Sequence, residues 1–130
     1  MIALLLALLL GGPAAAQERA VPQEAPAVQE SWLQRDTAVL QTLDKVNART
    51  ATLTVQVGKP VQYGTLTITL RACRIRSEEQ ATDAMAWLEV VDSRANPGTP
   101  PVFQGWMFAT APSVSMLQHP VYDVRVMRCK

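Results

Sequence analysis

Four side chains near the C-terminal end are of the types that hydrolytic enzymes combine. Two hydroxyls, an imidazole and a carboxylate occur in one short stretch, on Ser113, Ser115, His119 and Asp123. A catalytic triad is defined by geometry, however, and not by closeness along the chain. Neither serine lies in a G-x-S-x-G elbow, and Pro120 restricts His119 to extended backbone. We therefore expect no catalytic residue here, and interpret His119 as a structural residue at the start of a strand.

Arginine and aspartate side chains supply the other polar candidates. Arg71, Arg74 and Arg76 are close in sequence and could receive an anionic partner or ligand, or form a solvated face of a sheet. Asp44 and Asp92 could act as general acid or base, but isolated carboxylates near strand ends more often form turns. We expect turn formation for both aspartates and treat Arg71, His119 and Asp123 as minor polar-site candidates.

The two cysteines can pair only with each other. Cys73 and Cys129 would form a disulfide in an oxidising compartment, closing a long loop. The alternatives are two free thiols or a metal site, but two cysteines and the one histidine are too few for structural zinc, which usually takes four protein ligands. We predict the disulfide, no metal site and no cofactor.

The N-terminal residues 1–16 have the composition of a signal peptide. An apolar run over residues 2–10 is followed by a Gly-Gly-Pro break and three alanines. The run is shorter than the roughly 20 residues that a membrane-spanning helix needs. We expect cleavage after Ala16, export to the periplasm and no stable membrane insertion.

The net charge and the composition of residues 17–37 limit the functions and the domain boundaries that the rest of the chain can have. The formal net charge is +1, which argues against a nucleic-acid-binding surface. Residues 17–37 contain prolines and charges with few large aliphatic residues, and are predicted to form a flexible tether. Residues 31–43 are compatible with a helix or a strand, and we favour a strand that ends near Lys45. One β-domain is expected over residues 38–130.

Alternation of apolar and polar residues predicts further strands. The segments are residues 52–57, 64–73, 85–92, 102–109 and 121–129. A capping-box pattern at residues 77–80 predicts one or two helical turns toward Met85. The fold class is therefore all-β, a small antiparallel sandwich or barrel of five to six or more strands with one disulfide.

Strict alternation also predicts where the cysteines point. In residues 64–73, Ala72 shares the apolar face and Cys73 falls among the threonines. In the last strand, Cys129 falls with Asp123 and Arg125. Both cysteines are thus expected on polar faces, with a bridge at the rim of the sheet and outside the core.

Large apolar side chains on both faces of residues 102–109 indicate either a covered strand or a binding surface. The candidate interaction face consists of Trp87, Phe103, Trp106 and Phe108, with Met107 beside them. Aromatic residues and methionine are enriched at protein interfaces. Packing in the core is the alternative, because a domain of this size needs most of its aromatic residues inside. Trp32, in the tether, would dock on the domain or anchor a partner.

Several segments together resemble a known family. They are LDKVNART, VGKPVQYGTLTITLRAC, AWLEVVD and VFQGWMFATAPSVSMLQHPVYDVRVMRC, within residues 40–129. In this order they resemble the alphaproteobacterial secreted family called domain of unknown function 2155. GWMF and HPVYDV are the most specific parts, although Gln118 and Arg125 depart from the usual pattern. The resemblance implies a periplasmic single-domain protein and no particular activity.

These observations favour a non-catalytic periplasmic interaction module, an accessory of an envelope assembly whose partner is an envelope or periplasmic protein. The alternative is a small-ligand or glycan-binding β-domain in which Trp87 or Trp106 is a stacking platform. A hydrolase that acts through His119 and Asp123 is the third possibility.

Overall fold

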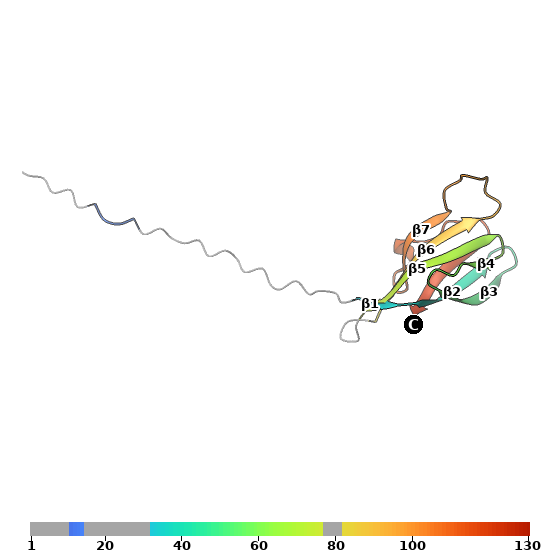
Figure 1. Ribbon diagram of the computed structural model, residues 1–130, viewed down its shortest axis with the longest axis horizontal. Coiled ribbons are helices and arrows are strands. Elements are labelled where there is room, and N and C mark those ends of the chain that lie inside the picture. The colour runs from blue at the N-terminus through green and yellow to red at the C-terminus, as the bar shows by residue number, and fades with distance from the viewer. Residues whose placement is uncertain (1–10, 15–31, 77–81) are drawn as a thin grey trace, which may run out of the picture.

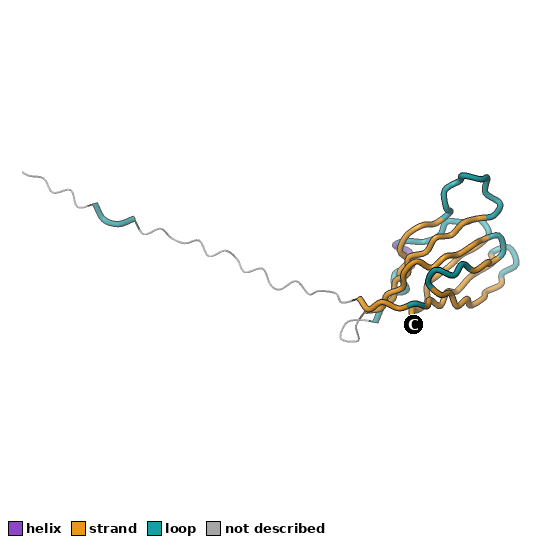
Figure 2. Tube along the Cα trace, viewed as in Figure 1, coloured by secondary structure: helices purple, strands orange, loops and turns teal. Residues whose placement is uncertain are grey.

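A computed structural model describes residues 11–14, 32–76 and 82–130, and the described part is built almost entirely of strands (Figures 1 and 2). The predicted signal peptide, apart from residues 11–14, and the predicted capping box at 77–80 lie outside the described residues. The elements are β1 (Trp32–Arg35), β2 (Thr37–Asp44), β3 (Arg49–Gln56), β4 (Val61–Tyr63), β5 (Leu66–Arg76), β6 (Ala84–Asp92), β7 (Phe103–Phe108), the 3-10 turn η1 (Pro112–Val114) and β8 (Tyr122–Cys129).

The strands form two antiparallel sheets. The larger sheet has the order β1-β5-β6-β7, with β4 also paired to β5, and the smaller has the order β3-β2-β8. Strand β8 lies against β5 and β6, so the sheets pack face to face. The predicted all-β fold is confirmed, and of the two architectures considered it is the sandwich. Tyr122–Cys129, for example, form strand β8 within the predicted residues 121–129, with Val124 and Val126 facing the core.

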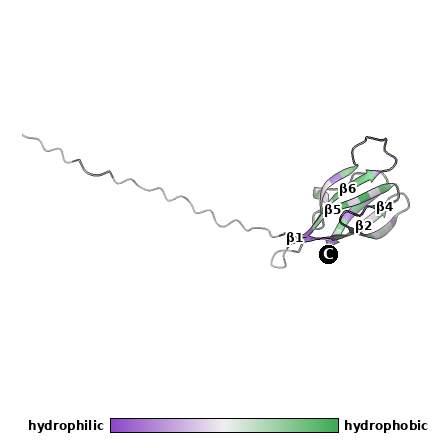
Figure 3. Cartoon of the chain, viewed as in Figure 1, coloured by the Kyte–Doolittle hydropathy of each residue, from purple (hydrophilic) through white to green (hydrophobic). Residues whose placement is uncertain are grey.

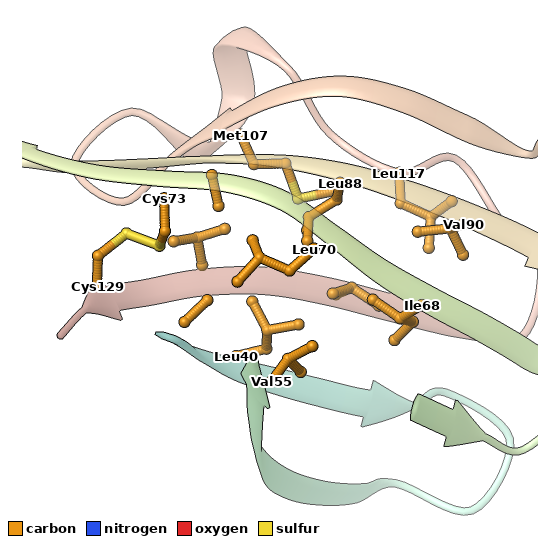
Figure 4. Packing of buried hydrophobic residues seen from close by; sticks show 14 of the residues in the cluster. Leu40, Val55, Ile68, Leu70, Cys73, Leu88, Val90, Met107, Leu117 and Cys129 are labelled. Carbon is orange, nitrogen blue, oxygen red and sulfur yellow. A yellow bond between two sulfur atoms is a disulfide. The ribbon is translucent and has the colours of Figure 1, made fainter. Parts of the chain in front are cut away.

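The core lies between the two sheets (Figure 4). Its largest fully buried side chains come from four strands and include Leu40, Val55, Ile68, Leu70 and Leu88. Hydrophobic residues are concentrated on the central strands β5 and β6 in Figure 3. Burial of a leucine side chain contributes roughly 1.5–3 kcal/mol, so this layer supplies the main driving force for folding.

The disulfide joins the two sheets through the core, which corrects the predicted rim position. Cys73 on β5 and Cys129 on β8 are bonded, with Cα atoms 5.7 Å apart, and both are buried (Figure 4). The register of β5 against β6 skips Arg71, and that of β8 against β2 skips Met127. Each skipped residue forms a β-bulge, which reverses the alternation beyond it. Both cysteines therefore turn inward, and Ala72 leaves the apolar face.

One expected boundary is wrong. Trp32–Arg35, assigned to the tether, forms strand β1 and pairs with residues 73–76 of β5, and β2 begins at Thr37. Pairing with β5 fixes an extended backbone at residues 32–35, so these residues belong to the sandwich. The strand predicted over residues 85–92 is confirmed as β6.

The segment between β7 and β8 covers the open side of the sandwich. Its Leu117 is 3% exposed and belongs to the core, whereas Val114 and Met116 are exposed. The covering segment, residues 109–121, is thus held by one buried leucine and presents apolar side chains outward.

Candidate interaction surface

The outward side of the larger sheet carries all three tryptophans of the chain. Residues that pair directly across antiparallel strands share a face. The register pairs Trp87 with Trp106, and Met85 with Phe108, while the intervening Ala86 and Met107 point into the core. We call this outward surface the aromatic face, and its members are Trp32, Arg74, Arg76, Met85, Trp87, Trp106 and Phe108.

Two arginines of the aromatic face each lie over a tryptophan ring. The guanidinium of Arg76 lies 5.1 Å from the ring centroid of Trp32, and that of Arg74 lies 5.2 Å from the ring centroid of Trp106. Both distances are within the range of cation–π attraction, which contributes about 0.5–1 kcal/mol at exposed sites. The three tryptophan rings are half-buried at the surface and remain in contact with solvent.

The aromatic face has an excess of positive charge. Arg71 and Glu89 form an ion pair of 3.6 Å at its margin. Within the described ranges, no carboxylate forms an ion pair with Arg74. An anionic group could therefore approach Arg74 without displacing a described carboxylate.

One member of the predicted interaction face does not belong to it. Phe103 pairs with Val90 and packs against the core, on the inner side of β7. Odd- and even-numbered residues of a strand point to opposite faces, so Phe103 lies on the other face from Trp106 and Phe108. The other three predicted residues, Trp87, Trp106 and Phe108, do lie together.

An apolar cleft of about 180 Å³ opens between β7, the covering segment and β8. Its walls include Met107, Phe108, Met116, Leu117, Val124 and Val126. Ser113 and Ser115 also line it. Typical sites for drug-sized ligands measure roughly 300–1,000 Å³, so this cleft suits one or two apolar side chains better than a whole cofactor.

His119 has a structural environment. Its Nε2 lies 2.8 Å from Oδ2 of Asp92, and its Nδ1 accepts the backbone N–H groups of Val121 and Tyr122 at 3.1 and 3.2 Å. Because Nδ1 is an acceptor, the ring hydrogen is on Nε2 and is donated to Asp92. The ring also stacks on Tyr122, with centroids 5.4 Å apart. Both nitrogens are thus engaged, and neither faces a serine hydroxyl as a general base would.

Asp92 holds that histidine from the end of β6. Hydrogen bonds from the His119 ring, the Arg94 N–H and the Thr65 hydroxyl lower the pKa of the Asp92 carboxyl, against the opposing effect of burial. Asp92 also forms a turn through Arg94, at 2.9 Å. The carboxylate therefore stays charged at neutral pH and ties the covering segment to the sheet.

The remaining polar candidates are accounted for by local structure. Asp123 forms an ion pair with Lys45 at 3.3 Å, and the Lys45 ammonium donates to the His119 carbonyl at 2.5 Å. Asp44 accepts the N–H groups of Val46 and Asn47 and so forms the predicted turn. The Asn47 side chain is the main cause of the lowered pKa of Asp44.

Trp32 docks on the domain, which was one of the two alternatives predicted for it. It pairs with Arg76 across β1 and β5 and so joins the aromatic face. The sequence did not predict the partner of His119, which is Asp92 and not Asp123, the aspartate closer to it in sequence. No local signal marks this pair, because 27 residues separate its members.

The described residues contain neither a metal-binding cluster nor a membrane-spanning helix. No cluster of three or more histidine, cysteine, aspartate or glutamate side chains there is arranged to hold a metal ion. No helix in the described ranges has the length and apolar composition to cross a membrane.

Comparison with known proteins identifies the family. Residues 38–129 match the family model described as "Uncharacterized protein conserved in bacteria (DUF2155)". The chain belongs to this family. The DUF2155 match covers β2 to β8 and therefore the whole sandwich except β1.

The chain is also similar to a curated bacterial protein. The chain is 23% identical over 87 residues to "Uncharacterized protein RP359" of Rickettsia prowazekii (strain Madrid E). The similarity covers 67% of this chain and 56% of the relative, so the chain spans little more than half of that protein's length. No solved structure is significantly similar to this DUF2155 member.

Proposed function

We propose that the protein is a non-catalytic interaction module of the periplasm that binds an envelope protein through the aromatic face. The observation that carries this proposal is the pair of arginine–tryptophan contacts, Arg76 on Trp32 and Arg74 on Trp106, on a half-exposed sheet surface. Tryptophan and arginine are the residues most enriched among interface hot spots.

The charge of the surface indicates the kind of partner. Arg74 has no ion-pair partner in the described residues, so an acidic group beside an apolar patch would match it. An accessory role in a larger assembly agrees with the absence of any free base at His119, whose ring nitrogens are both bonded. The periplasmic location is supported by the disulfide, which persists in oxidising compartments, and by the signal-like composition of residues 1–16.

Binding of a sugar or other small ligand is the competing function. Trp106 is a suitable stacking surface, but Arg74 already occupies its ring in the free protein. The cleft of about 180 Å³ is also small for a ligand site. A protein partner therefore fits this surface better.

Site-specific photo-crosslinking in cells that produce the chain tests the proposal. A photoreactive residue replaces Gln34, which is exposed and pairs with Arg74 across β1 and β5. The matched control replaces Thr52, which is exposed on β3 of the other sheet. We expect one envelope protein to be attached at position 34 and none at position 52, and the product to be lost in a folded Trp106→Ala variant.

Two outcomes contradict the proposal. Equal products from both positions would mean that the aromatic face has no special role. If no product forms at position 34 but envelope sugars quench tryptophan fluorescence, ligand binding replaces protein binding.

A further inference from the structure

Strand β7 is an edge strand whose outer backbone groups have no partner in the described chain. The Ala109 N–H donates to the Ala84 carbonyl at 2.8 Å, which sets the alternation of the β6–β7 ladder. By that alternation Met107 bonds toward β6, whereas Gln104 and Trp106 direct their N–H and C=O groups to the free edge. No backbone hydrogen bond among the described residues satisfies Gln104 or Trp106 on that side.

The composition of β7 leaves this edge unprotected. Edge strands usually carry charged residues or proline, which oppose pairing with another chain. Strands β1, β3 and β8 each contain arginine, and β4 has only three residues. Phe103–Phe108 reads FQGWMF and contains neither a charge nor a proline. It is the edge in this sandwich that most readily accepts an added strand.

The surroundings of β7 provide places for the side chains of an added strand. Successive side chains of a strand point to opposite faces. Those on the inner face would meet the apolar cleft, whose walls include Met107, Met116 and Val126. Those on the outer face would extend the row of Trp106 and Phe108.

Charge complementarity sets the chemistry of the outer face. The Trp106 ring holds the Arg74 guanidinium, 5.2 Å from its centroid, over the edge strand. Because no described carboxylate pairs with Arg74, an acidic side chain of an added strand would find an available cation there.

We propose that β7 binds an extended segment of a partner protein as an additional antiparallel or parallel strand. The segment has apolar residues at alternate positions, which enter the cleft, and an acidic residue on the other face, which approaches Arg74. This mode is β-strand addition, in which backbone hydrogen bonds supply affinity and alternate side chains supply specificity. The inference rests on the proposed function and names the class of partner segment.

A random peptide library displayed on phage, selected against the full chain, tests the proposal. Gln104→Pro removes an N–H that points to the free edge and so blocks pairing without breaking the β6–β7 ladder. Gln104→Ala keeps that N–H, and Thr52→Pro places proline on the free edge of β3. We expect enriched peptides with alternating apolar and acidic residues, whose affinity falls about tenfold or more in Gln104→Pro and is nearly unchanged in both controls.

Amide hydrogen exchange of the complex locates the bound peptide. The amides of Gln104 and Trp106 should exchange quickly in the free chain and slowly with the peptide bound, while that of Met107 is slow in both. Three outcomes would overturn strand addition. They are the enrichment of peptides whose affinity Gln104→Pro does not change, the absence of any enriched peptide, and unchanged amide exchange at Gln104 and Trp106 in the complex. Slow exchange that appears with rising protein concentration alone would assign the edge to a second copy of this chain.

The two proposals fail in different ways. A crosslinked protein at position 34 that is insensitive to Gln104→Pro retains the aromatic face as an interaction surface and overturns strand addition alone. Peptide binding at β7 without any crosslinked protein at position 34 retains strand addition and overturns the binding of an envelope protein through the aromatic face.

Discussion

Arg74 on β5 reaches the ring of Trp106 on β7, although β6 lies between the two strands. The arginine side chain therefore spans the outer surface of the middle strand and links the two strands on either side of it. Its stem covers apolar surface while its charged end stays at the edge of the sheet. Because of this contact, we regard the outer face of the larger sheet as an organised surface of its own, and not only as the outer side of strands that cover the core.

Trp106→Ala should leave the domain folded. The ring is half-buried on the outer face, so its loss should lower the free energy of unfolding by about 1–2 kcal/mol. Leu88→Ala, which opens a cavity in the core, should cost about 2–5 kcal/mol. Urea denaturation of both variants gives the comparison. If Trp106→Ala is as costly as Leu88→Ala, Trp106 is a core residue and the interaction surface loses its centre.

Reduction of the disulfide should destabilise the chain strongly. Cys73 and Cys129 are 56 residues apart, and a crosslink that closes a loop of this length stabilises by about 4 kcal/mol in the chain-entropy model. Urea denaturation with and without reductant measures the difference. A Cys73→Ala, Cys129→Ala double variant is the control, since reductant should not change its stability. Equal midpoints for the oxidised and reduced native chain would contradict the prediction.

The Asp92–His119 bond should make the fold sensitive to acid. The folded pKa of Asp92 is lowered, so its contribution to stability is present above the unfolded value of 3.8 and is lost as the pH falls through the folded pKa. We expect native stability to fall more steeply than that of Asp92→Asn as the pH decreases below about 4. Thermal unfolding over this range tests it, and parallel curves for the two proteins would show that the carboxylate does not contribute.

His119→Ala should loosen the covering segment without abolishing the fold. It removes the bond to Asp92 and the acceptor of two backbone N–H groups, at a cost of about 2–3 kcal/mol. The amide of Val121 should exchange faster while core amides of β5 change little. Uniformly faster exchange in all strands would indicate global destabilisation instead.

Gly64→Ala should be markedly worse than Gly98→Ala. Both glycines have positive φ, +56° and +83°, so alanine is strained at either position. At Gly64 an added Cβ would also overlap the Tyr122 hydroxyl, whereas at Gly98 it meets nothing within 4 Å. We expect a loss of about 1 kcal/mol at Gly98 and a further 1–3 kcal/mol at Gly64. Equal unfolding midpoints would show that Tyr122 moves away at no cost.

Alternation predicted most of the sandwich, and it failed where a single residue interrupts it. The strands that contain Leu88 and Val124 were predicted correctly, because the period of two is uninterrupted around both residues. Arg71 and Met127 are each an extra residue opposite an uninterrupted strand. The composition of the strands does not reveal such an insertion. The cysteines that follow were therefore assigned to the wrong face.

The membership of the aromatic face was predicted only in part. Trp87, Trp106 and Phe108 were grouped correctly from their apolar character, but Phe103 is separated from them by the pleat of β7. Trp32 was placed in a tether because β1 is short and partly polar, and its pairing with β5 depends on residues far away in the sequence.

The pairing of β2 with β8 brings together strands from opposite ends of the domain. The smaller sheet is therefore incomplete until β8 has been synthesised, and a chain that lacks β8 leaves Leu40 and its neighbours uncovered. Folding of this domain must consequently wait until β8 has left the ribosome, and before that point the exposed apolar strands need protection from aggregation.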